Sequence, residues 1–141
     1  MKTVIVDSDA LIALLNKDDL LAERALKTLE GLYRLEVRLL YPATTLVETT
    51  TTLQRRLSDA SLTKEIVKMI KESQFPVVAV DQEIIKSAEE LFNPSASKQN
   101  TLFDAVVAAI ANLQKAYAVF SFDSWYEKVG LTLAYKIIES D

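Results

Sequence analysis

Four short stretches of the chain are almost entirely apolar and rich in β-branched or aromatic residues, which is typical of strands buried on both faces. They are Thr3–Val6, Arg38–Ala43, Val77–Val80 and Ala116–Phe120. A fifth stretch, Leu131–Tyr135, has the composition expected of a strand at the edge of a sheet. We expect the second strand to end at Pro42, because proline cannot donate a hydrogen bond to a neighbouring strand.

Apolar residues at helical spacing fill the intervals between these stretches. The predicted helices cover Ala10–Leu15, Leu20–Tyr33, Thr44 or Thr45 to about Leu57, Ser61–Ser73, Gln82–Phe92 and Leu102–Lys115, and a short loop and helix cover Ser121–Lys128. The predicted N-caps are Thr44 or Thr45 in a capping box with Glu48, then Asp81, and Asn100 or Thr101. The polar segment Asn93–Asn100 is expected to be a loop.

Apolar strands that alternate with helices predict βαβ units, and therefore a parallel sheet covered by helices on both faces. The expected fold class is α/β, a three-layer α/β/α sandwich around a central, mainly parallel sheet of four to five strands. The 141 residues contain no linker and no internal repeat, so we expect a single domain over residues 1–141.

The composition excludes several kinds of chemistry. The chain has no histidine and no cysteine, which rules out an imidazole base, a Ser-His-Asp or Cys-His nucleophile and a thiolate metal site. A net charge of −4 argues against capture of nucleic acid by a broadly basic surface. No apolar run approaches the ~20 residues of a membrane span, and the start of the chain does not resemble a signal peptide. A cytoplasmic protein with no membrane association is the expectation.

Four acidic residues stand where the predicted fold would gather them. Asp7 ends the first strand and Asp123 follows the fourth by two residues, so both are expected at the carboxyl edge of the sheet, where function collects in such folds. Asp104 lies in the first turn of a nearly all-apolar helix, and Glu48 lies among hydroxyls and aliphatic residues. Acids that converge without a cation repel one another, and oxygen ligands of this kind favour a hard divalent ion such as Mg²⁺.

Each acid also has a simpler interpretation when it is taken alone. Asp7 or Asp123 fits a turn residue or helix N-cap, Asp104 fits a favourable helix-dipole position, and Glu48 fits the capping box. The four together are harder to explain in this way. The remaining acids are interpreted as caps or as solvated faces, and they include Asp9, Asp18, Asp19, Asp59 and those of Gln82–Phe92.

The segments that carry these acids resemble a known family. VIVDSDALIALLN, TLVETTTTLQRRL, TLFDAVVAAIA and VFSFDSWYEKVGL resemble the four acidic motifs of PIN-domain ribonucleases, and especially those of VapC toxins. The resemblance covers essentially the whole chain, in order. It implies that the acids hold Mg²⁺ or Mn²⁺ and position a water that attacks an RNA phosphodiester, and the residues concerned are Asp7, Glu48, Asp104 and Asp123.

The resemblance also assigns supporting residues. Ser121 matches the small polar residue before the fourth acid, and Ser8 follows the first acid where the family often has Thr or Ser. Asp9 departs from the pattern, because Ser or Asn is commoner there. Its extra carboxylate is expected either beside the metal ligands or as a source of further repulsion that raises the demand for metal.

Further expectations concern the mechanism and the partners. Asp7, Asp104 and Asp123 would bind the ion, while Glu48 would orient the water or join a second metal site. The implied substrate is single-stranded or looped RNA, and the implied partners are a second copy of the chain and an antitoxin whose C-terminal segment covers the acidic cleft. Leu11–Leu15 with Leu20–Leu32 is either its docking surface or core. Candidates for a phosphate-steering rim are Arg55, Arg56, Lys86 and Lys98.

Two alternatives remain open from the residues alone. The first is a haloacid-dehalogenase-like phosphatase, because Asp7-Ser8-Asp9 after a strand resembles its nucleophile motif and Ser121 fits its later hydroxyl. No GDxxxD-like loop follows, and the chain's two glycines are misplaced for one. The second is a PIN-like binding module whose acids are catalytically idle.

Overall fold

The computed structural model describes residues 1–96 and 99–140, and strands alternate with helices through most of that length. The strands are β1 (Thr3–Val6), β2 (Arg38–Pro42), β3 (Val77–Val78) and β4 (Ala118–Phe120). The helices are α1 (Ser8–Leu15), α2 (Ala22–Arg34), α3 (Ala43–Arg55), α4 (Ala60–Lys71), α5 (Gln82–Leu91), α6 (Leu102–Leu113), α7 (Trp125–Lys128) and α8 (Ala134–Glu139).

The four strands form one parallel sheet in the order β3-β2-β1-β4. In the centre of the sheet Ile5 of β1 pairs with Leu40 of β2 on one side and with Val119 of β4 on the other. Parallel neighbours need long crossover connections, and the helices between the strands supply them. The predicted α/β class with a central parallel sheet is therefore confirmed.

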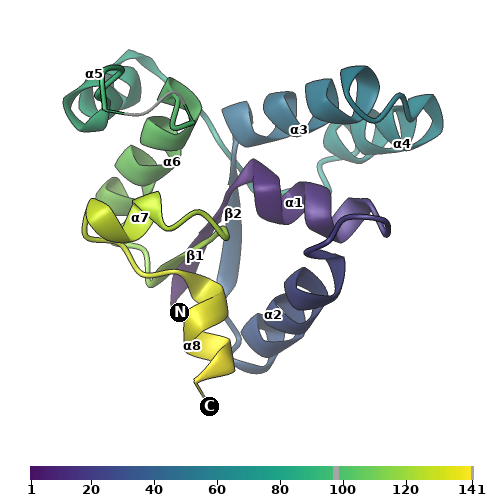
Figure 1. Cartoon of the computed structure of the whole chain (residues 1–141), viewed down its shortest axis with the longest axis horizontal. Coiled ribbons are helices and arrows are strands. Elements are labelled where there is room, and N and C mark those ends of the chain that lie inside the picture. The colour runs from purple at the N-terminus through teal and green to yellow at the C-terminus, as the bar shows by residue number, and fades with distance from the viewer. Residues whose placement is uncertain (97–98, 141) are drawn as a thin grey trace.

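Successive residues of β1 bury into two different hydrophobic layers, as the period of two in a strand requires. Ile5 packs into the layer built by α5, α6 and α7, whereas Val4 and Val6 pack into the layer that includes α1, α2 and α8. Figure 1 shows α5, α6 and α7 on one side of β1 and β2, with α1 and α2 on the other. This arrangement confirms the predicted three layers.

Helix α6 lies against the sheet and is buried over most of its length. Every residue from Ala105 to Ala111 is buried, which explains why the helix is apolar nearly all round. Its alanines allow close packing, and α5 lies beside it as the outer neighbour. The position of α6 matters for function because its first turn carries Asp104 towards the sheet edge.

The predicted fifth strand is wrong. Leu131–Tyr135 contributes only an isolated parallel bridge between Leu133 and Val119, and α8 begins at the next residue, Ala134. The backbone N–H of Val119 donates to the Thr132 carbonyl (2.8 Å), so the segment does reach the edge strand. It then turns into a helix that buries apolar side chains against the α1 and α2 layer. Strands β3 and β4 are also shorter than predicted.

The predicted capping box at the start of α3 is also wrong. The helix begins directly after Pro42, with no side-chain cap. The Thr45 hydroxyl instead donates to the Val6 carbonyl at the end of β1 (2.9 Å), and the Thr44 hydroxyl is buried with no hydrogen-bond partner among the described residues. Glu48 is therefore not a capping residue, and the bond from Thr45 ties its helix to the end of the central strand.

Two other predicted N-caps, Asp81 and Thr101, are confirmed, and Asp59, interpreted as a cap or a solvated residue, caps α4. Asp59 accepts a hydrogen bond from the Leu62 amide (2.9 Å), and Asp81 accepts one from the Ile84 amide (3.0 Å). Thr101 precedes α6, and its backbone N–H donates to Asp104 (2.9 Å). Asp104 therefore has a local structural role in addition to any chemical one.

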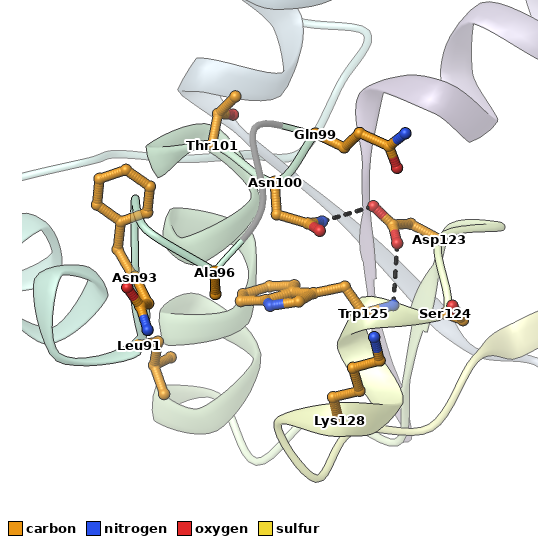
Figure 2. A pocket seen from close by; sticks show the side chains of 11 residues that line it. Leu91, Asn93, Ala96, Gln99, Asn100, Thr101, Asp123, Ser124, Trp125 and Lys128 are labelled. Carbon is orange, nitrogen blue, oxygen red and sulfur yellow. Dashed lines mark hydrogen bonds between the residues drawn. The ribbon is translucent and has the colours of Figure 1, made fainter.

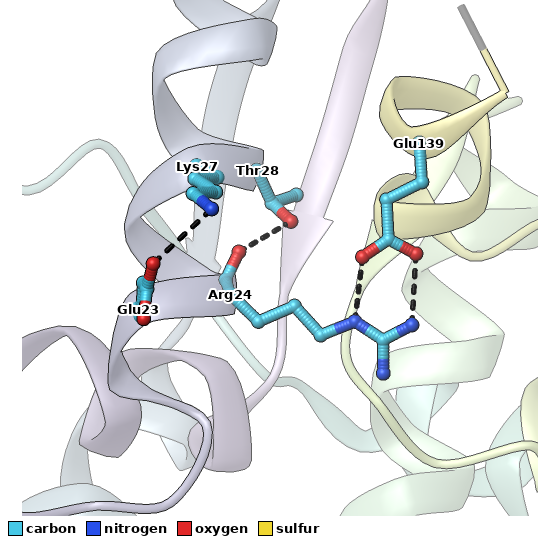
Figure 3. Close-up of polar contacts among 5 residues, drawn as sticks. All are labelled: Glu23, Arg24, Lys27, Thr28 and Glu139. Atoms are coloured by element: carbon cyan, nitrogen blue, oxygen red, sulfur yellow. Dashed lines mark hydrogen bonds and ion pairs between the residues drawn. The ribbon is translucent and has the colours of Figure 1, made fainter.

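The C-terminal helix is fastened to α2. A Cβ atom added to Gly31 would lie 2.5 Å from Cγ2 of Ile138, so only glycine lets the two helices approach this closely. At the rim of this contact the Arg24 guanidinium donates two hydrogen bonds to Glu139, of 2.6 and 2.8 Å (Figure 3), and stacks over the Tyr135 ring. Among the helices of residues 1–96 and 99–140, none is long and apolar enough to cross a membrane.

Candidate functional site

The candidate site lies where β1 and β4 end side by side. Asp7 directly follows β1, and its backbone N–H still bonds to the Phe120 carbonyl of β4 (3.0 Å). Ser121 and Asp123 follow β4. Parallel strands bring their carboxyl ends to the same edge, so residues that are more than a hundred positions apart in sequence meet here.

Asp7 is the most enclosed acid of the site, with only 3% of its surface exposed. Its carboxylate accepts hydrogen bonds from the Ser8 amide (2.8 Å), the Ser121 hydroxyl (3.0 Å) and the Tyr126 hydroxyl (2.8 Å). Burial raises the pKa of Asp7 well above its usual value of 3.8, and the charges of Asp9 and Asp104 raise it further. These bonds hold the carboxylate in one orientation.

Asp9 belongs to the same cluster, so its interpretation as a cap or solvated residue is wrong. It is half-buried, and its Oδ2 accepts hydrogen bonds from the Phe122 amide (2.8 Å) and the Ser121 hydroxyl (3.1 Å). Burial is the main cause that raises its pKa from 3.8 to about 6, and the charge of Asp123 contributes. Asp9 thus binds β1's end to the segment after β4 and adds a carboxylate to the site.

The Ser121 hydroxyl is shared between two acids. It lies within hydrogen-bond distance of Asp7 (3.0 Å) and Asp9 (3.1 Å), and it also accepts from the Asp123 amide (3.1 Å). A hydroxyl has one proton to donate and two lone pairs, so it cannot donate fully to both carboxylates. A proton held on one of the two acids would complete the arrangement, in keeping with the raised pKa of each.

Asp104 and Asp123 are joined by an amide. The Asn100 side chain donates to Asp123 (2.8 Å; Figure 2) and, at a longer 3.4 Å, to Asp104. The other oxygen of Asp123 accepts from the Trp125 backbone N–H (2.9 Å). Burial, and then the charge of Asp123, raise the pKa of Asp104, while the hydrogen bond from the Thr101 amide lowers it.

Glu48 approaches the cluster from α3. It is half-buried, and its carboxylate is hydrogen-bonded by the Ser8 side chain. Burial raises the pKa of Glu48, and the charges of Asp104 and Asp9 add to the effect. The acid is therefore within electrostatic reach of the others, although it comes from a separate crossover, on the helix that follows β2.

These carboxylates lie together without a counter-charge. Each of the four predicted acids and Asp9 lies outside the ion pairs found within residues 1–96 and 99–140. Half-buried and buried like charges cost free energy unless a proton or a cation binds. The negative charge of the cluster is therefore not balanced by any ion pair among the described residues.

The donor set fits a hard divalent cation in its chemistry, because it offers carboxylate oxygens and no nitrogen or sulfur ligand. In the described part of the chain, however, no three acids are grouped closely enough to hold an ion as they stand. Hydrogen-bond donors of the chain occupy the space, with Asn100 between Asp104 and Asp123 and Ser121 between Asp7 and Asp9. Binding would require these side chains to turn.

The sequence matches the PIN-domain family model over residues 4–131. The chain belongs to the PIN-domain family. This membership confirms the resemblance drawn from the four acidic segments and leaves the haloacid-dehalogenase alternative without support. No curated protein sequence matches the chain.

Solved structures of similar fold include three proteins from different organisms. The toxin VapC20 of Mycobacterium tuberculosis, described as cleaving the sarcin–ricin loop, is 19% identical with a TM-score of 0.74, over 92% of this chain and 96% of its own. FitAcB of Neisseria gonorrhoeae is 16% identical with a TM-score of 0.66, over 92% and 95%. VapBC2 of Rickettsia felis, bound to a DNA fragment from its promoter, is 12% identical with a TM-score of 0.59, over 93% and 96%.

The predicted basic rim of this PIN domain is only partly recovered. Arg55 and Arg56 are exposed at the end of α3, and Arg56 lines a groove that reaches Asp9. Lys86 lies on α5 and pairs with Glu83 (3.6 Å). Lys98, the remaining predicted member, lies outside the described residues.

Two residues of the PIN-domain site were not predicted. Tyr126 is fully buried and donates to Asp7, and Asn100 bridges two acids. Tyr126 follows Asp123 by three residues, which is the one hint of its position that the sequence contains. The sequence predicts Asn100 only as an alternative to Thr101 for the cap of α6, and in the structure Thr101 is the cap.

Proposed function

We propose that this PIN domain is a Mg²⁺- or Mn²⁺-dependent endoribonuclease and the toxin of a toxin–antitoxin pair that acts in the cytoplasm. The observation that carries the proposal is the set of unneutralised carboxylates at the carboxyl edge of the sheet in a member of this family. The proposed catalytic and metal-binding residues are Asp7, Glu48, Asp104 and Asp123, with Ser8, Asp9 and Ser121 in support.

The roles follow from how firmly each side chain is held. Asp7 is fixed by three hydrogen bonds and is the deepest acid, which suits the ligand that defines the metal position. Asp104 and Asp123 complete the ligand set once the amide between them turns away. A bound divalent ion supplies charge neutralisation, polarisation of the phosphate and a water that loses its proton more readily.

Glu48 is the acid that we assign to the attacking water. It approaches from α3 rather than from a strand end, and its raised pKa makes its carboxylate a better proton acceptor than an ordinary glutamate. Ser8 holds it in place through its side chain. Glu48 orients the water and accepts its proton, or joins a second metal site.

The proposed substrate is single-stranded or looped RNA. A flexible backbone can bring one phosphodiester to the enclosed acids, whereas a regular duplex offers its phosphates only on a wide, stiff surface. The exposed Arg55 and Arg56 would guide phosphates towards the site, because a protein of net charge −4 has no broad attraction for RNA.

The proposed protein partner is an antitoxin that covers the cleft. A groove of about 390 Å³ runs from Asp9 to Arg56 and Leu57, and it is lined by both apolar and charged residues. A segment with an apolar side chain and a carboxylate or a cation would fit it. The candidates for the proposed homodimer interface are exposed apolar residues of β3, α5 and α6, namely Val77, Ile85 and Leu113.

The test is cleavage of a mixed RNA pool by purified protein with Mg²⁺ or Mn²⁺, beside EDTA and beside an Asp104→Asn variant. Asp18→Asn, an exposed acid outside the cluster, is the matched control for the loss of one negative charge. We expect metal-dependent cleavage that Asp18→Asn keeps and Asp104→Asn loses. Undiminished cleavage by Asp104→Asn would place the chemistry elsewhere.

The same preparation separates the alternatives. Protein that binds metal but leaves every RNA intact would favour a binding module. Hydrolysis of a small phosphate ester that depends on Asp7, without RNA cleavage, would revive the phosphatase.

A further inference from the structure

A pocket of about 280 Å³ opens beside the acidic cluster, between the loop that precedes α6 and the start of α7 (Figure 2). Its walls include Trp125 and Lys128 from α7 and Asn93 and Asn100 from the loop. Small-molecule sites usually span about 300–1,000 Å³, so this pocket has room for one small flat group. None of the roles proposed above uses it as a binding site.

The pocket and the acidic cluster share a wall. Asp123 lines the pocket, and its two carboxylate oxygens accept from the Asn100 side chain and from the Trp125 backbone N–H. A phosphate brought to Asp123 would therefore have the pocket next to it. In a nucleotide the base is separated from its phosphate by one ribose, so a base is the group that would reach inside.

The Trp125 indole is the flat surface of this pocket. Figure 2 shows the ring extending across the pocket towards Ala96. The Tyr126 ring makes an edge contact with it at 5.3 Å between centroids, and Tyr126 is itself buried and hydrogen-bonded to Asp7. A half-exposed aromatic ring held by a buried neighbour is a stacking platform for nucleic-acid bases.

The polar lining suits a base as well. Side-chain amides such as that of Asn93 offer both donors and acceptors, which match the edges of an unpaired base. Lys128 is exposed at the wall next to Trp125 and forms no ion pair within residues 1–96 and 99–140, so its charge is available to a sugar–phosphate backbone. A purely apolar ligand would leave these groups unmatched.

We propose that this pocket takes the base of the nucleotide next to the cleaved phosphodiester, stacked on Trp125, and thereby selects where RNA is cut. The inference rests on the proposed ribonuclease function and adds to it a site for substrate selection. It concerns α7 and the loop before α6, and the residues that line this pocket are different from those that line the proposed antitoxin groove.

The first experiment uses the only tryptophan of the chain as a reporter. Wild-type protein with Mg²⁺ is titrated with AMP, GMP, CMP and UMP, and with ribose 5-phosphate as the ligand that lacks a base; free N-acetyltryptophanamide controls for light absorption. We expect saturable quenching by at least one nucleotide and none by ribose 5-phosphate. Equal responses to both, or no saturable response, would overturn the inference.

The second experiment maps cleavage sites in the RNA pool for Trp125→Ala and Trp125→Phe. Tyr33→Ala, which removes an exposed aromatic ring from α2, is the matched control. Loss of stacking predicts that the preference among flanking bases falls about tenfold in Trp125→Ala, with a higher KM, and is largely kept in Trp125→Phe. A merely structural role would lower cleavage at all sites alike and would count against the inference.

The two proposals fail in different ways. Saturable quenching by nucleotides in a protein that cuts no RNA would support the base pocket and remove the nuclease function. Metal-dependent cleavage with unchanged site preference in Trp125→Ala and no quenching would remove the base pocket and keep the nuclease.

Discussion

Two regions of this protein handle charge in opposite ways. On the surface around α8, two carboxylates each have a cation of the chain beside them: Arg24 of α2 contacts Glu139 at 2.6 Å, and Lys136 contacts Glu127 of α7 at 2.7 Å. All four side chains are well exposed to water. At the edge of the sheet the carboxylates are buried or half-buried, and each lies next to another carboxylate rather than a cation.

The difference shows where the chain neutralises its own charges and where it needs protons or a bound cation to do so. Exposed pairs are screened by water and salt and contribute little. Buried acids are scarcely screened, so leaving them unpaired keeps the folded state under electrostatic strain that a cation or protons can relieve. At the acidic edge, the unpaired carboxylates that would bind a cation also lower the stability of the metal-free protein. At the surface around α8, the charge pairs affect stability little and have no part in binding a ligand.

The largest expected effect comes from removing one charge of the acidic edge. Asp104→Asn should lower RNA cleavage by about 1,000-fold, or about 4 kcal/mol of activation free energy, through loss of electrostatic stabilisation. The same change should leave the metal-free protein equally or more stable, because Asn can still accept the hydrogen bond from the Thr101 amide. Cleavage rates and urea denaturation in EDTA measure both, and a variant that is inactive because it unfolds would contradict this account.

The pH dependence of stability should come next. The pKa of Asp9 rises from 3.8 to about 6 in the folded protein, so the fold favours its protonated form. The contribution of protonated Asp9 to the free energy of unfolding is fully present below pH 4 and is lost as pH rises through about 6. In the metal-free protein this loss amounts to about 2–3 kcal/mol.

Urea denaturation in EDTA across this range, for wild type and Asp9→Asn, isolates that contribution. The decline should be smaller in the variant, where the raised pKa values of Asp7, Glu48 and Asp104 still cause part of it, and Mg²⁺ should reduce it in the wild type. Parallel curves for the two proteins would show that Asp9 titrates normally.

A smaller effect is expected from packing at the α2–α8 contact. Gly31→Ala places a Cβ 2.5 Å from Ile138, and we expect a loss of about 1–2 kcal/mol in the free energy of unfolding, with RNA cleavage retained. Alanine normally favours a helix over glycine, so a stabilised variant would mean that Ile138 moves freely. Adding Ile138→Val should recover part of the loss, as measured by thermal unfolding.

The smallest effect is expected at the exposed pair. Arg24→Met removes the two hydrogen bonds to Glu139 and the stacking on Tyr135, yet the free energy of unfolding should change by little more than the error of a denaturation curve. Lys27→Met, in an exposed pair of the same helix, is the control. A loss in the free energy of unfolding as large as that of Gly31→Ala would show that water and salt do not screen this ion pair.

Most of the sheet could be predicted because strands buried on both faces must be continuously apolar. The fifth strand at the edge was wrongly predicted, because the apolar residues of Leu131–Tyr135 suit a helix and a strand equally. In the structure α8 packs its Ile138 against Gly31, which comes from a distant part of the chain. The cap at Thr45 was wrongly predicted because α3 begins two residues earlier, directly after Pro42, and the Thr45 hydroxyl donates instead to the distant Val6 carbonyl.

The acids could be brought together from sequence because parallel strands end at one edge. The hydrogen-bond partners of these acids could not be predicted from the sequence. Asp9 has the local pattern of a solvated helix start, and only the return of the chain at Phe122 encloses it. Asn100 lies in a loop and Tyr126 in a one-turn helix, and both contact the acids. The apolar spacing of the sequence does not predict the backbone path of such segments.

The bonds to Asp7 have a consequence for how the protein is made. Its partners Ser121 and Tyr126 are encoded 114 and 119 residues later. During synthesis β1 leaves the ribosome before the other strands. It cannot pair with β4, its neighbour in the sheet, until nearly all of the described chain has been made. The carboxylate at the centre of the site thus has no fixed orientation on a growing chain, and the acidic edge acquires its arrangement only after the residues that follow β4 have folded onto β1.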